Sequence, residues 1–91
     1  MAEHVQGRTE TTVLDFDGRV LEMFSNDGSK RMLASELSYT RSEPDKKGRV
    51  SVTFATLGGT AAMLALQPEY VADVDKVLAA LEKAGVQKQE R

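Results

Sequence analysis

The sequence predicts an α+β domain, mainly β, in which six or seven short antiparallel strands form a small, partly open barrel capped by one C-terminal helix. Two glycine turns in the first half agree on one apolar face, and a strictly alternating hairpin follows in the second half. Near residue 68 the apolar spacing changes from two to about 3.6 residues. Two near-orthogonal sheets under the same helix are the alternative arrangement.

The first hairpin turns at an Asp-Gly pair, residues 17–18, between two runs rich in β-forming residues. A two-residue loop at this pair sets Leu14 opposite Leu21 and Thr12 opposite Met23. A slip by one residue would place a glutamate opposite Leu14, so the hydrophobic pattern favours the two-residue loop.

A second glycine turn at residues 26–28 sets Met32 opposite Met23 and Ala34 opposite Leu21. The apolar face therefore continues onto a third strand over residues 30–34. A fourth strand is expected at residues 37–42.

The second half contains one more hairpin. Residues 43–48 hold a proline, a glycine and four charges, a composition typical of an exposed loop. Residues 49–56 and 60–66 read as strands around a turn with two glycines. A three-residue loop there pairs Phe54 with Ala62 and keeps apolar residues opposite one another.

The C-terminal helix is expected over residues 68–84. Val71, Val74, Leu78 and Leu81 recur at helical spacing. Proline suits the first helical turn, where its missing N–H costs nothing. Gly85 suits the position just past the helix end, where a left-handed backbone conformation is common.

Length and composition limit the classes of protein that this chain can represent. Its 91 residues allow one domain, expected at residues 12–86 between flexible tails at 1–11 and 87–91. The chain has no cysteine, which excludes disulfides and thiolate nucleophiles and fits a reducing cytoplasm, the expected location. A net charge of −2 argues against nucleic acid as a partner. The longest apolar run, residues 61–66, is far too short to span a bilayer, so any membrane contact is expected to be peripheral.

Three segments carry a resemblance to a known family. They are the hairpin at residues 13–18, the segment 31–37 and the final helix at 70–81. Together they resemble the short bacterial members of the pleckstrin-homology-like domains. That resemblance implies seven strands, so either residues 5–11 add an edge strand or the barrel is reduced. The closing helix lacks the tryptophan that is common in eukaryotic members.

No catalytic set, cofactor site or metal site is expected. The single histidine, His4, lies in a polar segment and has no partner for a triad or a metal site within the sequence pattern. Asp15, Asp17 and Gly18 mimic the start of a calcium loop, but the chain returns to strand by Val20, and hairpin chemistry explains these residues. The sequence therefore predicts a protein that is not an enzyme.

Leftover apolar residues on the outward side of the predicted strands indicate a partner surface. Val13, Val20 and Phe24 fall on the outer face of the first hairpin, and Met63 falls on the outer face of the last. Monomers rarely expose large apolar patches. The leading hypothesis is therefore a non-catalytic module that binds a protein partner or forms a homo-oligomer.

The alternative function is peripheral binding of an anionic lipid or a phosphate-containing ligand. Arg41, Lys46, Lys47 and Arg49 form the basic cluster of the chain, on and beside the predicted loop. In the family that the chain resembles, basic residues on such loops can hold phosphoinositide headgroups. Two acidic residues in the same segment leave an excess of about two positive charges, a modest attraction toward an anionic surface.

Overall fold

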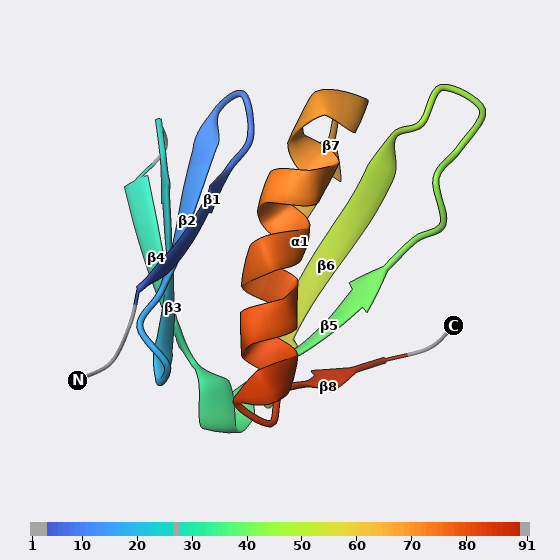
Figure 1. Cartoon of the computed structure of the whole chain (residues 1–91). Coiled ribbons are helices and arrows are strands. Elements are labelled where there is room, and N and C mark those ends of the chain that lie inside the picture. The colour runs from blue at the N-terminus through green and yellow to red at the C-terminus, as the bar shows by residue number, and fades with distance from the viewer. Residues whose placement is uncertain (1–3, 27, 90–91) are drawn as a thin grey trace.

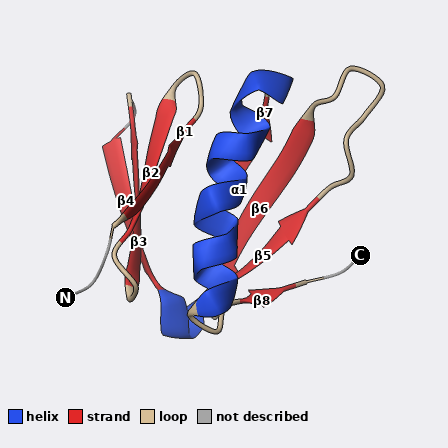
Figure 2. Ribbon diagram, in the orientation of Figure 1, coloured by secondary structure: helices blue, strands red, loops and turns tan. Residues whose placement is uncertain are grey.

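The protein consists of two separate four-stranded sheets and one long helix (Figures 1 and 2). A computed structural model describes residues 4–26 and 28–89. Sheet A contains β1 (Val5–Arg8), β2 (Thr12–Phe16), β3 (Val20–Ser25) and β4 (Gly28–Leu33), in that order. Sheet B has the order β7-β6-β5-β8 and contains β5 (Ser38–Arg41), β6 (Val50–Thr56), β7 (Gly59–Leu66) and β8 (Gln87–Lys88). A 3₁₀ turn (Ala34–Glu36) connects the sheets, and α1 (Pro68–Lys83) follows β7.

The α+β class, with a predominance of strands and a single C-terminal helix, is confirmed, whereas the six or seven strands and the partly open barrel are wrong. The described part of the chain has eight strands in two sheets that share no hydrogen-bonded ladder. The two additional strands, β1 and β8, lie where the sequence predicts tails. Both are short edge strands: β1 forms a hairpin with the adjacent β2, and β8 pairs in parallel with the distant β5. Strands held by such backbone ladders need no apolar alternation of their own.

The first hairpin has a longer loop than predicted. Leu14 pairs with Met23 and Phe16 with Leu21, a shift of two residues from the expected register. Asp17 explains the shift, because its Oδ1 accepts the N–H groups of Arg19 and Val20 at 2.9 and 2.8 Å and closes a wider turn. A shift of two preserves the face of every side chain, so the predicted core residues remain buried.

The second hairpin also shifts by two residues, which changes the residue that lies opposite Met23. Leu21 pairs with Met32, so Lys30 rather than Met32 lies opposite the buried Met23. Residues opposite one another in a sheet share a face. A lysine therefore starts on the inner face of sheet A, at its edge strand.

The register of the third hairpin agrees with the prediction. Phe54 pairs with Ala62 and Val52 with Leu64. A bulge interrupts the ladder after Phe54, and Ala61 is the extra residue on β7 without a partner on β6.

The C-terminal helix starts at the predicted residue, ends one residue early and closes with a Schellman cap. Gly85 adopts a left-handed conformation with φ of 98°. Its N–H donates to the Glu82 carbonyl at 3.0 Å, and the Val86 N–H donates to the Leu81 carbonyl at 2.9 Å. Val86 is buried and makes the chain turn back toward β5. Within the described residues, no helix has the length and apolar character needed to cross a membrane.

The core lies where α1 meets both sheets (Figure 1). The helix buries one face against sheet A and the end of sheet B, through Val74, Val77, Leu78 and Leu81. The largest fully buried side chains of the strands belong to the same cluster: Leu14, Leu21, Val50, Val52, Phe54 and Leu66.

α1 and sheet A approach each other closely at Gly7. A Cβ atom built on Gly7 would lie 2.5 Å from the backbone oxygen of Asp73 and 3.0 Å from Val77 Cγ2. The Arg8 N–H next to it donates to Asp73 Oδ2 at 2.7 Å. The edge strand β1 is thus fixed to the helix by a backbone contact that only glycine permits.

Gly7→Ala should destabilise the fold by about 1–3 kcal/mol, the usual cost of overpacking against atoms that cannot move aside. The measurement is urea unfolding followed by circular dichroism. Gly58→Ala is the matched control, because Gly58 does not adopt a left-handed conformation and its new Cβ would meet only Thr56 Oγ1 at 3.9 Å. Equal stability of the two variants would contradict the close approach of β1 to α1.

Asp73 should make stability depend on pH in the acid range. The Lys76 ammonium and the Arg8 N–H hold the pKa of this carboxyl below its usual value. The resulting stabilisation is therefore present above about pH 4, the unfolded value, and is lost as the pH falls through the folded value. Asp73→Asn should make the loss of thermal stability between neutral and acid pH shallower. An equal loss of melting temperature in the two proteins between neutral and acid pH would refute this role.

Candidate interaction surfaces

The outer face of sheet A carries two apolar pairs separated by a charged row. Val13 pairs with Phe24 at one end, and Val20 pairs with Leu33 at the other. The row between them contains Asp15, Glu22 and Arg31. Phe24 and Leu33 are 43% and 49% exposed, so each pair leaves apolar surface in contact with water. The three predicted residues of the first hairpin therefore share one face, but they do not form a continuous patch.

Met63 belongs to a different surface. It lies on the outer face of sheet B, opposite Thr53, and is 70% exposed. The structure does not bring it together with Val13, Val20 and Phe24.

Sequence reasoning missed Leu33. The predicted register of the second hairpin would have paired Val20 with Ser35, so the apolar neighbour of Val20 was hidden by the shift of two residues. Leu33 directly follows Met32, which is buried. Because successive residues of a strand face opposite sides, this order was the available signal that Leu33 points outward.

The basic cluster is divided by ion pairs. Arg41 makes a two-pronged contact with Asp75 of α1, with Nε 2.9 Å from Oδ1 and a terminal nitrogen 3.2 Å from Oδ2. Its side chain is only 21% exposed. Arg41 thus fastens β5 to the helix, and its charge is already matched.

Arg49 is engaged as well. Its Nε lies 3.0 Å from Asp45 Oδ2, while Asp45 Oδ1 accepts the N–H groups of Lys47 and Arg49. These backbone donors, that of Arg49 first, hold the pKa of Asp45 below its usual value. Lys46 and the Lys47 side chain are exposed on the same loop. Of the four predicted basic residues, two arginines hold carboxylates and two lysines face water.

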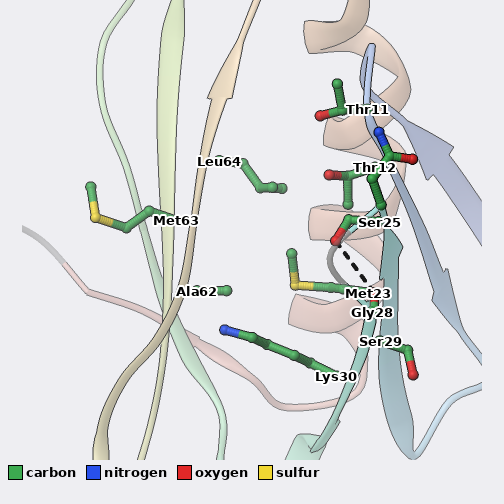
Figure 3. Close-up of a pocket in the computed structure, with 11 residues that line it drawn as sticks. Thr11, Thr12, Met23, Ser25, Gly28, Ser29, Lys30, Ala62, Met63 and Leu64 are labelled. Carbon is green, nitrogen blue, oxygen red and sulfur yellow. Dashed lines mark hydrogen bonds between the residues drawn. The ribbon is translucent and has the colours of Figure 1, made fainter.

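A groove runs along the seam between the two sheets, where the edge strands β4 and β7 face each other (Figure 3). Its volume is about 590 Å³. Met23, Thr12 and Leu64 line it and, at 7–8% exposure, are the most exposed of the buried residues. Lys30 reaches across from β4, and its ammonium donates to the Ala61 carbonyl on β7 at 2.7 Å.

Tyr39 is the buried titratable side chain nearest the helix–sheet junction. Its ring is 3% exposed and lies against Phe54, with centroids 6.4 Å apart. Burial, and then the charge of the nearby Glu82 carboxylate, raise the pKa of Tyr39 to about 12. Tyr39 thus keeps a neutral phenol where β5 meets α1.

Among residues 4–26 and 28–89, no three His, Cys, Asp or Glu side chains gather where they could hold a metal ion. Comparison of the chain with known protein families, with curated proteins and with solved structures finds no match.

The titration of Tyr39 provides a direct test of its contact with the helix. In a Tyr70→Phe variant, Tyr39 is the only tyrosine, since the chain has two. Absorbance at alkaline pH should show half-titration near pH 12 in the folded protein and near pH 10 in urea. Because the pKa of Tyr39 is raised in the folded protein, its neutral phenol contributes stability that is complete below about pH 10 and is lost as the pH rises through the folded value. Titration near pH 10 in the folded protein would show that the phenol is not buried beside Glu82.

Proposed function

We propose that this chain is a non-catalytic interaction module that associates with a second copy of itself through the outer face of sheet A. The observation that carries the proposal is the pair of exposed large apolar residues, Phe24 and Leu33, on strands whose inner faces are buried. Apolar side chains at the ends of a flat sheet face, with charges between them, suit a protein surface better than a small ligand.

Charge complementarity favours a second copy as the partner. Glu22 and Arg31 are neighbours across β3 and β4, with Oε2 and Nε 3.7 Å apart. A two-fold axis parallel to these strands and midway between them would set Glu22 of each copy against Arg31 of the other. The same axis would set Val20 against Leu33 in both directions. The axis also sets Phe24 of each copy beside Ser29 of the other. One symmetry operation thus matches acid with base and, at the Val20–Leu33 end, apolar with apolar, as an isologous interface requires.

A relationship to the pleckstrin-homology-like domains is part of this proposal. The succession of hairpins and the closing helix support it. The eight strands and the open seam depart from the barrel that the resemblance implies. Because such a fold hosts unrelated roles, the proposed association depends on the surface residues and not on the resemblance.

Binding of an anionic lipid or phosphate is the weaker alternative. Arg41 and Arg49 would first have to release Asp75 and Asp45. Lys46 and Lys47 alone would contribute about 2 kcal/mol toward an anionic membrane.

The test is the molar mass in solution, measured over a concentration series by sedimentation equilibrium. The wild-type chain should approach twice its monomer mass, and a Phe24→Ser/Leu33→Ser variant should dissociate with a Kd about tenfold higher or more. Met63→Ser removes an even more exposed apolar side chain from the other sheet and should leave the Kd unchanged.

Two outcomes would reject the proposed interface. The first is a wild-type chain that stays monomeric at all concentrations, and the second is equal weakening by both variants. Binding of anionic vesicles that disappears in a Lys46→Glu/Lys47→Glu variant would instead support the alternative function.

A further inference from the structure

We infer that the seam between β4 and β7 is a binding site for an extended peptide that carries an acidic side chain. The peptide would lie between the two edge strands and hydrogen-bond to one of them. This site is separate from the outer face of sheet A, so the two proposals can fail independently.

Both walls of the seam are unpaired strand edges. Among the strands of residues 4–26 and 28–89, β4 ends sheet A and β7 ends sheet B, so each has a hydrogen-bonded neighbour there on one side only. Along such an edge, alternate residues direct their N–H and C=O groups away from the sheet. Two such edges facing one groove offer backbone donors and acceptors to an extended chain.

Lys30 spans the seam. A lysine side chain reaches about 6 Å from Cα to Nζ, given its bond lengths. The ammonium of Lys30 ends 2.7 Å from the Ala61 oxygen, so β4 and β7 stand up to about 9 Å apart along this inward-pointing side chain. Because side chains stand away from the plane of their sheet, this distance lies across the inner face of sheet A, and an extended peptide in the seam would pair with the edge of one of the two strands.

The floor of the seam is apolar and incompletely covered. Met23 and Leu64 contribute side chains from the two sheets, and Thr12 adds a hydroxyl beside them. An extended peptide directs every second side chain toward such a floor. Apolar residues at these inward positions would complete the burial of the core.

Lys30 determines the charge of the occupant. Of the described residues that line the groove, it alone carries a charge. Its ammonium binds the carbonyl of Ala61, the extra residue of the β7 bulge. A carboxylate on the peptide would be a stronger acceptor for this ammonium than the neutral carbonyl. The expected inward pattern is therefore an acidic residue flanked by apolar ones.

The probe is the peptide acetyl-Thr-Val-Thr-Glu-Thr-Val-Thr-amide, whose valines and glutamate share one face when it is extended. It is titrated into the isotopically labelled full chain and followed by amide NMR. The amides of β4 and β7 should shift, and those of the strand that pairs with the peptide should become protected from hydrogen exchange. The same peptide with glutamine in place of glutamate should bind about tenfold more weakly, because it loses the charge-assisted bond.

Variants of the protein separate recognition from folding. Lys30→Met keeps the apolar stem, removes the charge and should abolish the preference for the glutamate peptide. Lys30→Arg should retain that preference, which would show that the groove tolerates substitution at this position. Lys46→Met removes a lysine from the exposed 41–49 loop and should bind the peptide like the wild type.

Three results would overturn the inference. The first is the absence of shifts at peptide concentrations up to about 1 mM, the weak limit of useful affinity. The second is a set of shifts confined to other strands. The third is a Lys30→Met variant that binds no peptide of either kind and instead associates through β4, because Lys30 would then serve only to guard an edge strand.

Discussion

The packing of one helix face against two sheets without a common hydrogen-bonded ladder is the constraint on which this structure depends. Sheets A and B share no ladder, so Val74, Val77, Leu78 and Leu81 of α1 supply much of the apolar contact between them. The helix is fixed on both sides. On the side of sheet A, the backbone of Gly7 touches that of Asp73. On the side of sheet B, Arg41 Nε donates a hydrogen bond to Asp75 Oδ1 at 2.9 Å. The helix therefore sets the distance between the sheets, and through it the width of the seam.

The seam stays open because its residues favour a single side-chain contact between β4 and β7 and disfavour a backbone ladder between these strands. The shifted register of the second hairpin puts Lys30 on the inner face of β4. Opposite it, the bulge at Ala61 frees a carbonyl of β7 from the ladder with β6. Direct pairing of β4 with β7 would bury the lysine charge in the core, at a high desolvation cost. With the seam open, the ammonium stays near water and still satisfies the carbonyl.

Local patterns predicted the parts of the fold that depend on neighbouring residues. The third hairpin and the helix with its Gly85 cap follow from alternation, spacing and turn chemistry, and they form essentially as predicted. The first two hairpins keep their predicted faces, but Asp17 selects a longer loop in the first through side-chain hydrogen bonds that pairing rules do not contain. β1 was one of the two alternatives left open for residues 5–11, and its pairing with β2 decides for the strand. β8 escaped prediction because its partner, β5, lies far away in the sequence. The division of the basic cluster escaped for a similar reason, since Arg41 and Asp75 are 34 positions apart.

The four sheet edges differ in how much unpaired backbone they offer to a partner. Four strands end the two sheets: β1, β4, β7 and β8. β1 lies against α1, and Asp73 already accepts its Arg8 N–H at 2.7 Å. β8 spans two residues and offers too little edge for a ladder. β4 and β7 are six and eight residues long, face one another and enclose the most exposed part of the core. Unpaired backbone, uncovered apolar floor and an accessible positive charge coincide at this seam, and a single extended acidic segment would satisfy all three.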